Sequence, residues 1–109
     1  MKRYCLTLDL KDDDALIAEY DRRHENVPAA IEQSILDSGI TAMQIYRLGT
    51  RMFMIIETAD GFDFARKAQM DAANPHVQAW EDMMWKLQQP LPQAKDGERG
   101  LLMKPVFDL

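Results

Sequence analysis

Three stretches of alternating apolar and polar residues constrain the fold of this chain most. Residues 3–10, 41–48 and 52–58 each show the two-residue period of a β-strand. Because alternate side chains of a strand point to opposite faces, each stretch has two distinct faces. The third stretch is apolar on both: Met52, Met54 and Ile56 on one face, and Phe53 and Ile55 on the other. Both faces of the sheet therefore need cover, and a face that no helix covers needs a partner.

Helical segments separate the first two of these strands. Asp12 or Asp13 is a suitable N-cap for a helix that runs to about Arg23, since short acidic side chains accept hydrogen bonds from the free N–H groups of a first turn. Pro28 opens a second helical segment, and Gly39 ends it. The chain then turns back into the second strand.

The second half of the chain is also expected to contain strands followed by helices. A short hairpin connection at 49–51 joins the second and third strands. Residues 62–73 are expected to be helical, and Pro75 starts another helix that runs to about Leu87. Residues 88–100 are expected to form a long surface connection, and residues 103–107 a short last strand.

The resulting order is β-α-β-β-α-β in a single domain, residues 1–109. This order predicts an α+β, ferredoxin-like fold: a four-stranded antiparallel sheet with helices on one face. The uncovered face carries apolar side chains, so a homodimer packed sheet to sheet, a dimeric α+β barrel, is expected.

Composition excludes several classes of function. The net charge of -5 and the lack of a basic patch argue against a nucleic-acid partner. No apolar stretch approaches the roughly 20 residues that span a bilayer, so no membrane partner is expected. The first residues alternate like a strand rather than a signal peptide. A single cysteine, Cys5, fits a reducing cytoplasm. With no CxxC pair, no glycine-rich phosphate loop and no cluster around His24 or His76, neither a metal nor a cofactor is expected.

A few residues are suited to acid–base chemistry or to sugar binding. His24 lies near the end of the first helix, and its imidazole can give or take a proton near neutral pH. Tyr20 lies one turn earlier on the same face, and Tyr46 lies within the second strand. Each also has a structural reading: a local capping histidine and two core tyrosines. Glu32 and Glu57 are candidate carboxylates.

Segments spread along nearly the whole chain resemble the L-rhamnose mutarotase family. They are Glu19-Tyr20-Asp21-Arg22-Arg23-His24, Pro28, Ile45-Tyr46, Trp80, Met83 and Val106-Phe107. The resemblance implies that the chain interconverts the α and β anomers of a 6-deoxy-L-hexose, with His24 as the proton donor. It also implies that Tyr20 binds the substrate. From their own chemistry, Tyr46 is a candidate to hydrogen-bond a sugar oxygen and Trp80 to stack on the sugar ring. Met54, Met83 and Met103 are candidates to line a pocket for the 6-methyl group.

The chain also departs from the pattern of that family. Val27, Met43 and Ala79 stand where the family typically carries aromatic residues. The residues expected to carry the reaction remain, but pocket positions differ, so L-fucose and L-rhamnose are both expected substrates, L-fucose slightly ahead.

Mutarotation needs one group to protonate the ring oxygen and another to take the proton of the anomeric hydroxyl. His24 is expected to be the acid, and Tyr20, Tyr46 or a carboxylate the partner. The alternatives are a non-catalytic ferredoxin-like binding or regulatory module, and a haem-handling or monooxygenase-type protein in which His24 would be a ligand.

Overall fold

The sheet is built around the N-terminal strand. The computed structural model describes residues 1–109, and its strands follow the order β2-β3-β1-β4, with β5 also paired to β1. The bounds are β1 Lys2–Leu10, β2 Ile40–Leu48, β3 Arg51–Thr58, β4 Gln88–Gln89 and β5 Leu101–Leu102. Every pairing is antiparallel. This is the α+β, ferredoxin-like arrangement predicted from the order of the elements.

Four helices cover one face of this sheet. Their bounds are α1 Asp14–Glu25, α2 Ala29–Asp37, α3 Phe64–Ala72 and α4 Pro75–Trp85. Asp13 caps α1 by accepting a hydrogen bond from the N–H of Leu16 at 3.1 Å, which decides between the two expected caps. Gly39, with φ +98°, follows α2 in a backbone conformation that favours glycine.

The two faces of the sheet follow from the strand register. Leu8 pairs with Met52, and Leu6 pairs with Met54. Paired residues share a face, and the near-complete burial of Leu8 and Met52 identifies it as the face under the helices. The intervening residues, Phe53 and Ile55 among them, therefore lie on the open face. Of the residues expected to need a partner's cover, Met52 and Met54 are covered by the chain's own helices.

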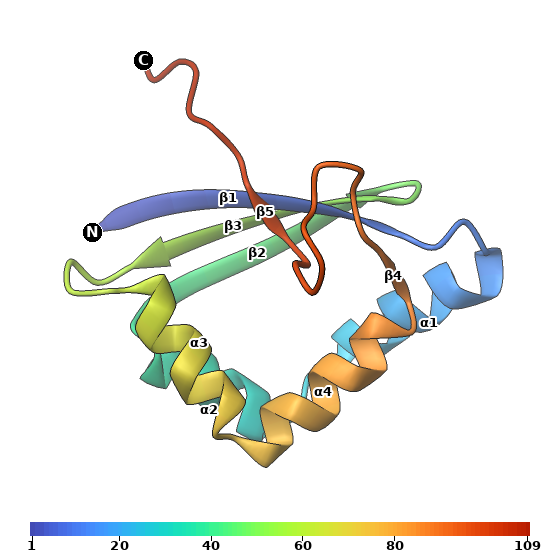
Figure 1. Ribbon diagram of the computed structural model, residues 1–109, viewed down its shortest axis with the longest axis horizontal. Helices are drawn as coiled ribbons and strands as arrows, with labels where there is room; N and C mark the ends of the chain where they lie inside the picture. The colour runs from blue at the N-terminus through green and yellow to red at the C-terminus, as the bar shows by residue number, and fades with distance from the viewer.

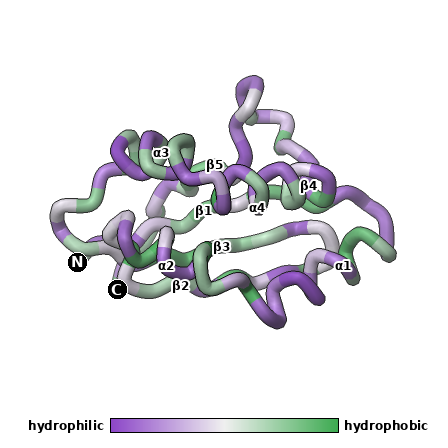
Figure 2. The backbone as a smooth tube through the Cα atoms, turned by 90° about the horizontal axis from the view of Figure 1, so that it is seen from below, coloured by the Kyte–Doolittle hydropathy of each residue, from purple (hydrophilic) through white to green (hydrophobic).

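The core lies between this sheet face and the helices. Its buried cluster comprises Leu8, Leu10, Tyr20, Met52, Met84 and Leu87. Figure 1 shows all four helices below the sheet, and Figure 2 shows α1 and α2 in one row with α3 and α4 in the other. The strands are visible between the two rows, so the sheet covers the space between the two pairs of helices.

The outer edge of β1 is filled by two short strands instead of one. Gln88–Gln89 pairs with Asp9 and Leu10, whereas Leu101–Leu102 pairs with Leu6 and Thr7. Residues 90–100 leave the sheet between them. The expectation that all of 88–100 is connection is thus wrong at its start, because β4 completes the sheet there.

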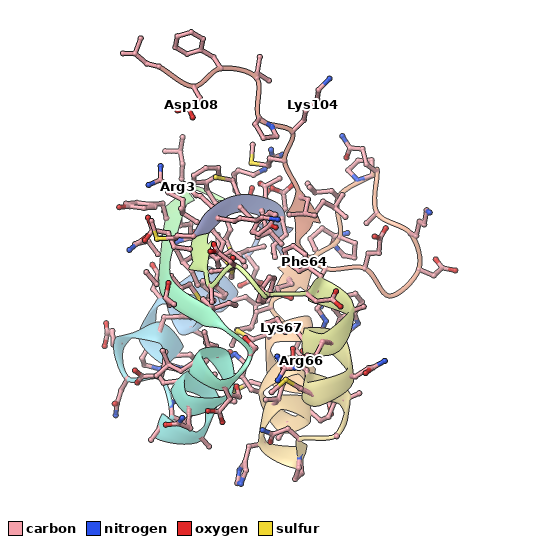
Figure 3. The ribbon with its side chains drawn as sticks, turned by 90° about the vertical axis from the view of Figure 1, so that its left-hand side faces the viewer. Arg3, Phe64, Arg66, Lys67, Lys104 and Asp108 are labelled. Atoms are coloured by element: carbon pink, nitrogen blue, oxygen red, sulfur yellow. The ribbon has the colours of Figure 1, made fainter.

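The C-terminal residues do not form the expected strand over 103–107. Met103 donates its N–H to the carbonyl of Cys5 at 2.8 Å, and pairing then stops. Pro105 has no N–H with which to continue it. Figure 3 shows this end, with Lys104 and Asp108, rising from the sheet on the side away from the helices. Val106 and Phe107 are more than 80% exposed, so in the single chain they do not shape a pocket. No helix has the length and apolar character to cross a membrane.

Candidate functional site

A cavity of about 370 Å³ lies between the covered face of the sheet and the helices. Cavities of this size hold small ligands in other proteins. Apolar side chains form most of its wall, and they come from all three long strands and all four helices. They include Leu6, Leu8, Ile31, Ile35, Ile40, Met43, Ile45, Met52, Met54, Ile56, Phe64, Val77 and Met84. Polar side chains are the minority of the lining residues, and they decide which polar ligand atoms the cavity can bind.

The imidazole of His24 lies on this wall between two aromatic rings. Its centroid is 4.2 Å from that of Tyr20 and 5.5 Å from that of Trp80, the latter edge to face. Tyr20 precedes it by one turn of α1, and Trp80 comes from α4 in the other row of helices. All three line the cavity. The structure thus brings together three of the residues singled out in the sequence, from segments 56 positions apart (80 minus 24).

The hydrogen bonding of His24 defines which ring nitrogen is available. Nδ1 lies 2.8 Å from the carbonyl oxygen of Tyr20. A carbonyl oxygen only accepts, so Nδ1 carries a hydrogen and donates it. Nε2 is left without a protein partner. The neutral ring therefore offers Nε2 as a proton acceptor, and the imidazolium offers it as a donor.

The hydroxyl of Tyr20 remains protonated in this setting. Tyr20 is 4% exposed. Its burial, together with the nearby charge of Asp21, raises the pKa of Tyr20 well above the ordinary value of a tyrosine. This phenol can donate or accept a hydrogen bond, but it cannot serve as a phenolate base at neutral pH.

An ion pair fastens α1 to the sheet beside these residues. Arg47, near the end of β2, donates from Nε and Nη2 to the two carboxylate oxygens of Asp21, at 2.8 and 2.5 Å. A third bond runs from Nη1 to the carbonyl of Gly49 at 2.8 Å. The hydrogen bonds from Arg47 lower the pKa of Asp21. Bidentate geometry fixes orientation, so this pair holds the turn of α1 that carries Tyr20.

Charged side chains from the second half of the chain border the same cavity. They are Lys67 and Asp71 on α3, Glu81 on α4 and Arg99 on the 90–100 segment. Lys67 and Asp71 form an ion pair at 2.5 Å. The sequence reasoning missed all four residues. The sequence could have identified Glu81, because it falls within the apolar stripe of α4. The residues around Arg99 form no pattern that would single it out.

The cavity excludes several residues that the sequence suggested. Met54 lines it, but Met83 packs against the core cluster without reaching it. Met103 is 43% exposed on the C-terminal segment. Tyr46 is 60% exposed and pairs with Phe53 on the open face, because its neighbour Ile45 takes the inward position of β2. Within one chain, the sheet separates Tyr46 from His24.

The two carboxylates proposed from sequence also lie elsewhere. Glu57 is bonded to Arg3 at 3.1 Å on the open face. Glu32 is exposed and borders a second hollow of about 580 Å³ beside β2. His24, Val27 and Met43 border both hollows. Positions that depart from the family pattern therefore lie where the main cavity meets the outer surface. No group of three or more His, Cys, Asp or Glu side chains is placed to hold a metal ion.

A family model and two relatives match nearly the whole chain. The family model described as L-rhamnose mutarotase matches residues 3–109. An L-fucose mutarotase of Xanthomonas campestris is 42% identical, over all of this chain and 89% of that protein. A UPF0734 protein of Dictyostelium discoideum is 32% identical, over 99% of this chain and 90% of that protein.

Solved structures show the same fold at low sequence identity. The L-rhamnose mutarotase of Formosa agariphila superposes with a TM-score of 0.73 at 19% identity, over 100% of this chain and 99% of that one. The tetracenomycin F2 cyclase of Streptomyces glaucescens gives 0.63 at 14% identity, with the same coverage of both chains. The second has a different name and activity, so the shared fold alone does not select a reaction.

Proposed function

The chain belongs to the L-rhamnose mutarotase family and is an isomerase that acts on sugars, and we propose that its substrate is a free 6-deoxy-L-hexose, L-fucose ahead of L-rhamnose. The observation that carries the proposal is the imidazole of His24, held between Tyr20 and Trp80 on the wall of an apolar cavity. The 42% identity to an L-fucose mutarotase supports the order of the two sugars.

The reaction opens and recloses the pyranose ring. The proton of the anomeric hydroxyl leaves O1, the bond from C1 to the ring oxygen breaks, and the ring oxygen takes a proton. The resulting aldehyde turns about its bond to C2, and the ring closes on the other face. His24 supplies the proton to the ring oxygen from Nε2 of its imidazolium and takes it back on closure. General acid or base catalysis of this kind contributes about 100- to 10,000-fold.

The aromatic and apolar walls orient the sugar. The indole of Trp80 offers a flat surface for the apolar face of a pyranose, and the phenol of Tyr20 offers a hydrogen bond to a sugar oxygen. Met54 is one of the apolar side chains that line the cavity, and such a surface suits the 6-methyl group of the sugar. A hydroxyl in place of a hydrogen at C6 would lose its bonds to water there without replacement.

The test is anomer exchange measured by saturation-difference NMR. L-Fucose and L-rhamnose are compared with L-galactose and L-mannose, which differ from them only by the hydroxyl at C6. We expect acceleration for the deoxy sugars, greatest for L-fucose, and less for their hydroxylated counterparts. Binding of these sugars without faster exchange would favour the non-catalytic binding module. Equal rates with and without the C6 hydroxyl would refute the deoxy preference.

We further propose that two copies pair through the open face of the sheet. Phe53, Ile55 and Tyr46 lie on this face without cover from the chain's own helices, and the apolar C-terminal residues rise on the same side (Figure 1). Contiguous apolar surface of this kind marks interaction sites. Sedimentation should give twice the 12.6 kDa of one chain, and Phe53→Glu should shift the protein to the monomer. A clean monomer at micromolar concentration contradicts the proposal.

A cytoplasmic location is part of the same proposal. The single cysteine, Cys5, has no disulfide partner in the chain, which suits a reducing compartment. Fractionation of the native cells should recover the protein with cytoplasmic markers, and recovery with secreted proteins would refute this location.

A further inference from the structure

Glu81 is an acidic residue on the apolar side of α4. Val77, Trp80, Glu81 and Met84 follow the spacing of one helix face and all line the cavity. Its neighbour Asp82 is exposed and lies outside the cavity wall. The apolar face of α4 packs against the sheet, and a glutamate on that face is unfavourable for folding because its side chain is half-buried. A role in function would account for its presence there.

The side-chain carboxylate of Glu81 has no ion-pair or hydrogen-bonding partner in the chain. It takes part in none of the ion pairs. Arg99 comes close, but its Nη1 donates to the backbone carbonyl of Glu81 at 2.8 Å, and its guanidinium stacks on Trp85 at 4.6 Å. The other carboxylate in the cavity wall, Asp71, is engaged by Lys67. Glu81 is thus the carboxylate of the cavity that is left free for a ligand.

A partly buried charge without a partner costs folding free energy, and such groups gather at functional sites. We propose that Glu81 is the second catalytic group of the mutarotase, the base that accepts the proton of the anomeric hydroxyl. This inference rests on the proposed sugar substrate. It replaces Glu32 and Glu57, which the fold places outside the cavity, and it leaves Tyr20 a hydrogen-bonding role.

The chemistry requires both groups at one end of the sugar. O1 and the ring oxygen are both bonded to C1, so the acid and the base must reach neighbouring atoms. The ring of His24 contacts the indole of Trp80, and Glu81 is the next residue of the helix. In the opening step, Glu81 takes the proton from O1, the electron pair forms the C1–O1 double bond, and the ring oxygen leaves with the proton of His24. Closure on the other face returns both protons.

The experiment compares Glu81→Gln with Asp82→Asn, the neutral amide change at the next position of α4. Exchange of L-fucose anomers is measured for both and for the wild type, with circular dichroism to verify the fold. Loss of a base predicts a rate at least about a hundredfold below wild type for Glu81→Gln. The exposed Asp82→Asn variant should keep the wild-type rate. A Glu81→Gln variant within a few-fold of wild type would overturn the inference.

The pH profile separates a base from a residue that only supports the site. The other ionisable groups bordering the cavity are Lys67 and Asp71 of α3, Arg99 of the 90–100 segment, and His24 and Tyr20 of α1. A carboxylate base is lost on protonation, so the wild-type rate should fall on the acid side. Glu81→Gln should lack that acid limb while keeping the dependence due to His24. An acid limb that persists in Glu81→Gln would assign it to another group.

Chemical rescue tests the same role in a variant with space at the site. Formate added to Glu81→Ala should restore part of the lost rate in proportion to its concentration, and it should leave His24→Ala unchanged. Failure of rescue in folded Glu81→Ala would count against a proton-transfer role. A wild type that accelerates no sugar of the panel would overturn the proposed function with this inference. An active wild type with an equally active Glu81→Gln would overturn this inference alone.

Discussion

Replacing His24 by alanine tests the central contact of the site. The substitution removes Nε2, the ring nitrogen without a protein partner, and with it the proton donor for the ring oxygen. A lost general acid lowers the rate by at least about a hundredfold. At about 1.36 kcal/mol per tenfold, this corresponds to about 2.7 kcal/mol of activation free energy.

The same substitution has a calculable effect on stability. It removes the bond from Nδ1 to the carbonyl of Tyr20, worth about 0.5–1.5 kcal/mol. It also removes the ring contacts with Tyr20 and Trp80, each worth about 0.5–1.5 kcal/mol. The total of about 1.5–4.5 kcal/mol is below the free energy of unfolding of typical domains, about 5–15 kcal/mol. The variant should therefore fold, and its loss of activity should come from the missing proton donor.

The assay is saturation-difference NMR on L-fucose, paired with circular dichroism and urea unfolding. His76→Ala is the matched control, because His76 is the other histidine and is exposed at the start of α4. It should keep the wild-type rate and stability. Near-wild-type exchange by a folded His24→Ala would remove His24 from the mechanism. A large loss accompanied by unfolding would show that the ring is chiefly structural.

Three further predictions, the first with a control variant, test the core, the Asp21–Arg47 ion pair and the hydroxyl of Tyr20. Leu10→Ala should lower the free energy of unfolding by about 2–5 kcal/mol, since Leu10 is 2% exposed in the core. The control Leu36→Ala, at a position that is 57% exposed, should change it by less than about 0.5 kcal/mol. Equal urea midpoints for the two variants would contradict the assigned core. Asp21→Asn should lower the melting temperature at neutral pH, because the Arg47 bonds lower the pKa of Asp21 below its ordinary 3.8. That stabilisation is present above the ordinary value and is lost as pH falls through the folded one, so the difference from wild type should vanish in acid; a gap independent of pH would refute the linkage. Tyr20→Phe should keep the fold and reduce exchange on the order of tenfold, the loss of one hydrogen bond to the sugar, and an unchanged rate would show that the hydroxyl does not bind substrate.

Local sequence determined the elements of this protein. Alternation and capping residues located β1, β2, β3 and all four helices, because these signals act over a few neighbouring residues. The order of the elements then indicated the ferredoxin-like sheet. The spacing of Tyr20 and His24 on one helix face was also readable, since it depends only on the helical period. The family, recognised from ordered motifs, is confirmed by the match over residues 3–109.

Tertiary structure decided which residues share the cavity. The register of β2 against β3 turns Ile45 inward and Tyr46 outward, and that choice depends on where the helices pack. The last strand was predicted at 103–107, but the strands that pair with β1 are β4 and β5, of two residues each. Such short pairings depend on contacts between the two ends of the chain, which no local pattern records. Glu81 joined His24 for the same reason: α1 and α4 meet only when the sheet brings the two halves together, and no local pattern records that approach.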